Sequence, residues 1–217
     1  MFKSSVFIIS ILLLAACGSR QAGNTVYNIQ AGDILFQDLD CGAPCDAIEK
    51  VTEGVNGHDF SHCGIVAEVD GQLKVVEAYG KVQAVSIDSF LARSKDGEGH
   101  PKVLIGRLKG DKKLALKSAE LSEKYIGKAY DNAFTMGDDS YYCSELVYEC
   151  FKEANGDSIV FPLNEMTFTD PETGELMPFW INYYKELGIA VPEGEPGINP
   201  GAISRNERLE IREVTKN

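Results

Sequence analysis

Positive charge is scarce in this sequence. The chain of 217 residues has 21 lysines and arginines against 33 aspartates and glutamates, and its formal net charge is −12. Such a chain lacks the excess of cations that would neutralise the phosphates of nucleic acids or the headgroups of anionic lipids. The composition therefore argues against nucleic acid as a partner and against membrane adhesion through charge.

Long hydrophobic runs are also scarce. The apolar run at residues 6–14 follows Lys3 and is too short to span a bilayer as a stable helix, which is typical of an export signal. It leads into the sequence LAACG at residues 14–18, which resembles a bacterial lipobox. In that signal the cysteine, here Cys17, is lipidated and becomes the first residue of the mature protein. An ordinary secretory signal that happens to border a cysteine is the alternative.

These features predict how the chain is organised. We expect a lipoprotein signal peptide at residues 1–16, a linker at residues 17–29 and a single domain at residues 30–217. About two hundred residues suit one hydrophobic core, and the sequence contains no internal repeat or low-complexity stretch. A lipid on Cys17 would anchor the protein in the bacterial cell envelope, and Gly18 after it favours the outer membrane, facing the periplasm.

Only six cysteines are present. Cys41 and Cys45 flank the sequence GAP, and an exported chain permits a disulfide between them. Free thiols and a metal-binding pair are the alternatives. Since no second Cys/His pair has zinc-like spacing, we expect no metal and no other cofactor. Cys63 and Cys150 fall in apolar runs that are typical of a protein core.

The sequence YYCSELV at residues 141–147 predicts the start of a helix, because apolar residues recur at helical spacing through Phe151. Cys143 would lie on the first turn. There, free backbone N–H groups and the helix dipole favour the thiolate, the form that attacks carbonyl carbons. A buried cysteine on an amphipathic helix fits the same pattern, so the assignment needs a base elsewhere in the chain.

Histidine is rare, with three residues in the chain. His100 and His58 lie in segments typical of loops. The spacing of His58 and His62 would suit a metal pair only on a single helix, and His62 begins a strand-like run at residues 62–69, so we discount a metal. His62 is therefore the candidate base, about eighty residues before Cys143.

A predicted hairpin relates His62 to a carboxylate. An Asp-Gly turn at residues 70–71 would pair His62 with Tyr79 on the returning strand. Because side chains alternate along a strand, His62, Glu77 and Tyr79 would project from one face, with Glu77 diagonal to His62. Glu77 can then orient the imidazole. A glutamate on the solvent face of an edge strand is the alternative, and a slip of one residue would point Glu77 away.

The remaining pattern predicts a mixture of strands and helices. Strands are expected at residues 32–37, 62–69, 72–79, 81–87 and 103–108, and helices at residues 46–52, 88–93 and 111–125, besides the one that begins near Cys143. The tail beyond Gly156 holds most of the prolines, and we expect it to wrap irregularly around the domain.

Five short runs occur in the order typical of a known family. They are GDILFQ at residues 32–37, FSHCGIV at 60–66, VEA at 76–78, GKAYD at 127–131 and YCSELV at 142–147. Together they resemble the circularly permuted NlpC/P60 hydrolases, the YiiX/YebB-like branch of the papain-like superfamily, over roughly residues 31–154. The resemblance implies an α+β fold of the permuted papain-like type, with an antiparallel sheet packed against the nucleophile helix.

The resemblance also implies roles for single residues. Cys143 would be the nucleophile, His62 the general base and then acid, and Glu77 the orienting group. The backbone N–H of Cys143 would stabilise the oxyanion. Tyr142 or Tyr130 is a candidate for a further donor, and Tyr79 is a candidate for contact with the substrate. Each of these rings can equally be a packing residue.

Three functions remain open from the sequence. The leading one is a cysteine hydrolase that cleaves amide bonds in peptidoglycan stem peptides or related peptides through an acyl-enzyme. The second is a hydrolase or acyltransferase of the same fold that acts on lipid acyl groups. The third is a non-catalytic binding module of the cell envelope, which would have no need of Cys143, His62 and Glu77 together.

Overall fold

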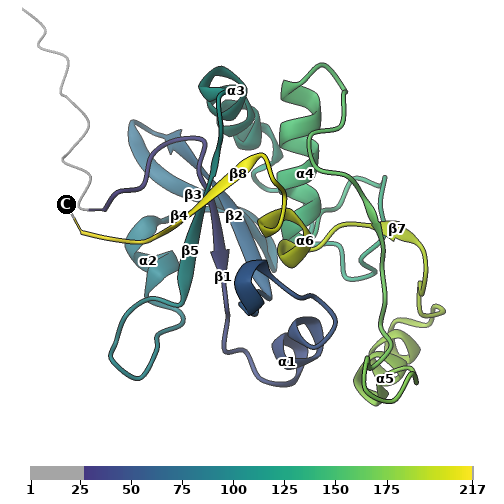
Figure 1. Cartoon of the computed structure of the whole chain (residues 1–217). Coiled ribbons are helices and arrows are strands. Elements are labelled where there is room, and N and C mark those ends of the chain that lie inside the picture. The colour runs from purple at the N-terminus through teal and green to yellow at the C-terminus, as the bar shows by residue number, and fades with distance from the viewer. Residues whose placement is uncertain (1–26, 217) are drawn as a thin grey trace, which may run out of the picture.

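Antiparallel pairing organises the fold. The computed structural model describes residues 27–216, and its main sheet has six strands in the order β4-β3-β2-β1-β5-β8, each antiparallel to its neighbours (Figure 1). The strands are β1 (Ile34–Gln37), β2 (His62–Val69), β3 (Gln72–Tyr79), β4 (Lys81–Ser86), β5 (Val103–Leu108) and β8 (Leu209–Glu213). A separate two-stranded ribbon joins β6 (Asn164–Glu165) to β7 (Pro196–Gly197).

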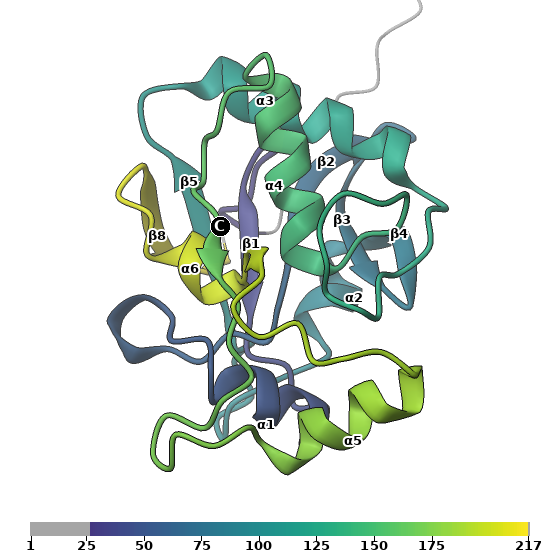
Figure 2. The same ribbon diagram turned by 90° about the vertical axis from the view of Figure 1, so that its right-hand side faces the viewer.

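Helices cover both faces of the sheet. They are α1 (Ala43–Glu49), α2 (Ile87–Leu91), α3 (Lys112–Ser122), α4 (Cys143–Ala154), α5 (Pro178–Leu187) and α6 (Pro200–Ser204), with short 3₁₀ helices at Val55–Gly57 and Glu123–Tyr125. Figures 1 and 2 show α3 and α4 together against one face and α2 against the other. The fold class is therefore α+β, and its core lies mainly between the sheet and the pair α3–α4.

The β2–β3 hairpin has the predicted register. Val69 pairs with Gln72, and the ladder continues to Ile65 opposite Val76. Asp70 and Gly71 both have positive φ, at 54° and 71°, which a two-residue turn of the type favoured by right-twisted strands requires. This register keeps His62 and Glu77 on the same face of the sheet.

Helix boundaries differ slightly from the predicted ones. The first helix begins at Ala43, three residues before the predicted start at Asp46, because Pro44 in its first turn has a φ suited to a helix start. Asp111 caps α3 as expected, accepting a hydrogen bond from the N–H of Leu114 at 2.9 Å. The α-helix ends at Ser122, and a 3₁₀ turn completes the segment to Tyr125.

The tail is more regular than we expected. Strand β8 extends the main sheet, with Leu209 opposite Leu108 and Ile211 opposite Gly106. Helix α5 packs an aromatic cluster against α1, and both figures place these two helices together at one end of the molecule. No helix within residues 27–216 is long and apolar enough to cross a membrane. The predicted signal peptide and Cys17 lie outside the described residues.

Candidate active site

Cys143 is the first residue of α4. Its side chain is buried at 6% exposure, and the thiol borders a cavity. The Cys143 N–H has no hydrogen-bond acceptor within residues 27–216, so it is free for a ligand. A free N–H at the positive end of a twelve-residue helix favours negative charge at this point.

His62 is the first residue of β2, at the end of the sheet where α4 begins. Its imidazole is buried, stacks on Phe90 at 5.7 Å between ring centroids, and meets the edge of Tyr79 at the same distance. His62 and Cys143 lie close enough for each side chain to shift the pKa of the other. The fold thus brings together two residues that are about eighty positions apart in the sequence.

Glu77 holds the other side of the imidazole. Its Oε2 lies 2.7 Å from Nε2 of His62, which leaves Nδ1 to face the thiol. The carboxylate is fully buried and also accepts hydrogen bonds from both terminal nitrogens of Arg93 and, at 3.2 Å, from Nε2 of Gln83. Four donors therefore fix this one carboxylate.

The contacts shift the pKa values of all three groups. Burial alone would raise the pKa of Glu77, but hydrogen bonds from Arg93 and His62 outweigh it and lower the pKa to about 2. Burial alone would lower the pKa of His62, but its hydrogen bonds to Cys143 and Glu77 raise it to about 9. Hydrogen bonds from Cys63 and His62 lower the pKa of the Cys143 thiol well below its usual range, against the effect of burial. Both shifts favour a thiolate on Cys143 beside an imidazolium on His62.

Arg93 and Gln83 join the site although the sequence does not predict them there. Arg93 follows α2, and its guanidinium also lies over the ring of Tyr79 at 4.8 Å from the centroid. In the sequence it is one basic residue at the end of a short helical turn, without a motif around it. The one usable signal is indirect, since a carboxylate in an apolar run such as that of Glu77 calls for a cation.

The three candidate tyrosines have different surroundings. The hydroxyl of Tyr142 is engaged within the protein, accepting from the N–H of Ile198 and contacting the sulfur of Met136, both at 3.2 Å. Tyr79 is half-exposed and packs between His62 and Arg93. Tyr130 lies beside Cys143, and burial and the thiolate raise the pKa of its phenol, which keeps it protonated. The hydroxyl of Tyr142 has partners within residues 27–216, so Tyr130, which borders the same cavity as Cys143, is kept as the candidate donor.

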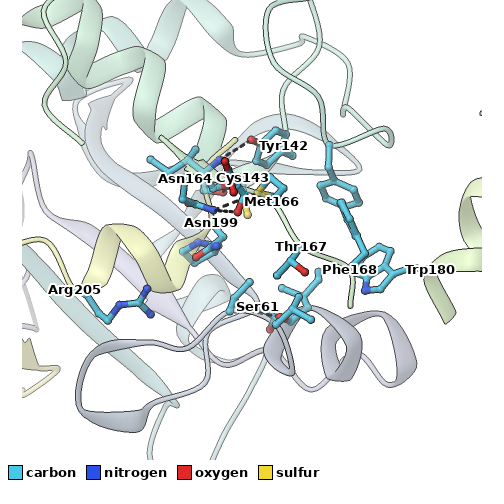
Figure 3. Close-up of a pocket in the computed structure, with 18 of the residues that line it drawn as sticks. Ser61, Tyr142, Cys143, Asn164, Met166, Thr167, Phe168, Trp180, Asn199 and Arg205 are labelled. Atoms are coloured by element: carbon cyan, nitrogen blue, oxygen red, sulfur yellow. Dashed lines mark hydrogen bonds between the residues drawn. The ribbon is translucent and has the colours of Figure 1, made fainter. Parts of the chain in front are cut away.

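Two cavities flank the pair Cys143–His62. The first, of about 290 Å³, is bordered by Cys143 and not by His62, and its wall is mostly apolar and aromatic (Figure 3). The second, of about 250 Å³, is bordered by His62 and Tyr79 and not by Cys143. Tyr130 borders both.

The Cys41–Cys45 pair lies at the second cavity. The two cysteines form a disulfide, with their Cα atoms 5.3 Å apart, and both border the cavity beside α1. Within residues 27–216, no three His, Cys, Asp or Glu side chains are grouped so that they could hold a metal ion. The disulfide therefore shapes a wall of the site and leaves no thiol pair for a metal.

Comparison with known proteins agrees with this geometry. The chain is 29% identical over 205 residues to the uncharacterized protein YiiX of Escherichia coli strain K12, an alignment that covers 93% of this chain and 91% of YiiX. A structure described as the crystal structure of metalloprotein yiiX from Escherichia coli O157:H7 superposes with a TM-score of 0.70 at 26% identity, covering 87% of this chain and 97% of that one.

The model of a family described as permuted papain-like amidase enzymes, YaeF/YiiX, C92, matches residues 28–211. This match spans most of the chain and includes the hairpin, the sheet and α4. The protein therefore belongs to the permuted papain-like amidases of the YaeF/YiiX family and is a hydrolase of the cysteine peptidase type.

Proposed function

We propose that this protein is a cell-envelope amidase in which Cys143 is the nucleophile, His62 the general base and acid, and Glu77 the group that orients His62. The observation that carries the proposal is the buried line of thiol, imidazole and carboxylate, with the thiol at the wall of a cavity. A structural cysteine on α4 would need neither a histidine partner nor a lowered pKa. Cys150, on the same helix, has a raised pKa because of burial.

Catalysis would begin with the thiolate of Cys143 attacking the carbonyl carbon of the substrate. The developing oxyanion would accept hydrogen bonds from the N–H of Cys143 and from the phenol of Tyr130. The imidazolium of His62 would then donate its Nδ1 proton to the leaving amine, and the C–N bond would break to give a thioester. Neutral His62 would next take a proton from water, and the resulting attack would release the acid and restore the thiolate.

The chemistry assigns the two cavities to two halves of the substrate. The acyl half becomes bonded to Cys143, so it would occupy the first cavity, which Cys143 borders. The amine half receives its proton from His62, so it would occupy the second cavity, which His62 borders. Apart from His62, no residue bordering the second cavity carries a titratable charge at neutral pH, which suits an uncharged leaving group.

For the substrate itself, we favour an amide bond in a peptidoglycan stem peptide or a related peptide, reached from a lipid anchor on Cys17 at the outer membrane. The support is the amidase family together with the export signal in the sequence. A lipid amide or ester is the second candidate. The observation that favours it is the apolar and aromatic wall of the first cavity, which includes Phe168, Trp180 and Ile198.

A metal has no place in this mechanism. The similar Escherichia coli structure is described as that of a metalloprotein. Here Nε2 of His62 contacts Glu77, both oxygens of Glu77 are held by Arg93, and the part of the chain that the structure describes has no cluster of three suitable side chains. The residues present do not fit a metal centre, so we derive no step through one.

Product analysis tests the proposed function. The purified protein would be incubated with muropeptides and, separately, with N-acylated lipids, and the products read by mass spectrometry beside a Cys143→Ala control. We expect cleavage of a muropeptide amide that the control lacks. Cleavage of the lipids alone would favour the second candidate. If neither class is cleaved at any pH between about 5 and 9, where the thiolate–imidazolium pair is expected, the amidase proposal fails.

A further inference from the structure

One positively charged side chain at the first cavity has no ion-pair partner in the described part of the protein. Arg205 immediately follows α6 and borders the same cavity as Cys143. Its side chain has no ion pair and no hydrogen bond within residues 27–216. In the same part of the chain, Arg93, Arg107 and Arg212 each hold a carboxylate. Arg205 thus brings an unpaired guanidinium to the cavity that Cys143 borders, in a chain whose net charge is −12.

Arg205 lies away from the place where Cys143 would attack the substrate. Figure 3 shows Arg205 and Trp180 on opposite sides of the view, with Cys143 apart from both, beside Asn164, Asn199 and Met166. A group held by Arg205 would therefore lie some way along the acyl half of a substrate, beyond the carbonyl that Cys143 attacks. The side chains drawn beside Cys143 are uncharged and include Asn164 and Asn199 as well as Met166, which suits an uncharged spacer between the two.

Besides the thiol of Cys143, Glu165 is the other side chain at this cavity that can carry a negative charge. It is exposed, and it forms no ion pair with Arg205. Arg205 is exposed as well, so its charge is partly screened by water until a ligand covers it. A planar guanidinium with free donors binds carboxylates and phosphates through two parallel hydrogen bonds, which gives selectivity as well as affinity.

We propose that Arg205 is a specificity residue that binds an anionic group, a carboxylate or a phosphate, at the far end of the acyl half of the substrate. This inference rests on the proposed function, because it takes the first cavity as the acyl site. It narrows the substrate to amides with an anionic acyl half and an uncharged amine half. A carboxylate would come from a peptide and a phosphate from a phospholipid.

Binding measurements on an inactive protein test the inference without turnover. The probes are p-nitroanilides of a six-carbon acyl chain that ends in a carboxylate, in a phosphonate or in the neutral methyl ester of the carboxylate. Each would be titrated into the full-length Cys143→Ala protein by calorimetry. We expect at least one charged probe to bind about tenfold or more tightly than the ester, as a charge-assisted pair predicts.

Two substitutions of Arg205, made in the Cys143→Ala protein, test whether Arg205 causes the tighter binding of the charged probe. Arg205→Gln should remove the preference for the charged probe, and Arg205→Lys should keep part of it. Arg208→Gln is the matched control, because Arg208 lies three residues further on, also lacks an ion pair within the described residues, and does not border the cavity. It should leave the preference unchanged.

The outcomes separate this inference from the proposed function. Equal binding of charged and neutral probes, no binding of the charged probes at millimolar concentration, or a preference that survives Arg205→Gln would overturn the role of Arg205. Selective binding to Cys143→Ala with no hydrolysis of any probe by the protein with Cys143 intact would support Arg205 and count against the amidase mechanism. A stronger preference for carboxylate indicates a peptide, and one for phosphonate indicates a phospholipid.

Discussion

Arg93 and Glu77 form a two-pronged ion pair in which the carboxylate is fully buried. Glu77 is therefore ionised at all physiological pH values, with a pKa of about 2. A carboxylate held so firmly cannot accept the proton of His62. In the proposed mechanism Glu77 would fix the direction of the imidazole and stabilise the imidazolium, and Arg93 would act on the site through Glu77.

Arg93 should matter for stability as well as for activity. Arg93→Gln would leave the buried carboxylate of Glu77 without its main cation, and loss of one partner of a buried pair typically lowers the free energy of unfolding by about 3 kcal/mol. Urea denaturation measures the change. Arg212→Gln is the control, since its pair with Glu210 is exposed to solvent and should contribute far less to stability. Equal effects of the two variants would contradict the buried-pair account.

Substitutions of Glu77 should reduce turnover in a graded way. Glu77→Gln keeps an oxygen that can accept from His62 but removes the charge that stabilises the imidazolium, so some activity should remain. Glu77→Ala leaves His62 free to rotate and should lose more, and Cys143→Ala should lose the most because it removes the covalent route. Steady-state kinetics on folded variants give the order. Wild-type turnover by folded Glu77→Ala would mean that another group orients His62.

The pH profile follows from the two shifted pKa values. The pKa of Cys143 is lowered and that of His62 is raised to about 9. The thiolate–imidazolium pair is therefore expected at pH values that lie between these two pKa values. Activity should rise at acid pH as the thiolate forms and fall as His62 loses its proton near pH 9. In Glu77→Gln the alkaline limb should move to lower pH, because the charge that raises the pKa of His62 is gone. An alkaline limb that stays in place would show that Glu77 does not act on His62.

Much of the site could be predicted from local sequence rules. The Asp-Gly turn sets the hairpin register, and alternation along the strands then places His62 and Glu77 on one face, as the structure has them. The helix start at Cys143 follows from its apolar spacing. These features depend on neighbours in the chain or on one short turn, which is why a single sequence suffices for them.

The features that could not be predicted depend on contacts between residues that are far apart in the sequence. Arg93 reaches Glu77 because α2 folds back over the sheet, and no local pattern encodes that contact. Strand β8 has a signal, since Leu209 and Ile211 alternate with charged residues, but the prolines before it suggest an irregular tail. Arg205 and Trp180, which border the first cavity, both belong to this tail. The position and lining of that cavity therefore could not be predicted from the sequence.

The lipid anchor proposed on Cys17 can be tested separately. Cys17 lies outside the described residues, and its lipidation is proposed from the sequence alone. Cys17→Ala should leave the thermal unfolding of the domain unchanged and release the protein from the membrane fraction, because the lipid would be its only attachment. Fractionation in high salt, with the unsubstituted protein beside it, measures this. A variant that still sediments with membranes would point to a different anchor.

The reactivity of Cys143 towards iodoacetamide, measured site by site against pH, tests the central claim most directly, because it needs no substrate. If Cys143 is a thiolate paired with His62, its alkylation rate should be nearly constant from about pH 6 to pH 8, whereas the rate of glutathione should rise about tenfold per pH unit in that range. His62→Ala should make the rate of Cys143 rise with pH in this range, because one of the groups that lower the pKa of its thiol is gone. A rate in the unsubstituted protein that climbs with pH in parallel with glutathione would contradict the assignment of Cys143 as the nucleophile.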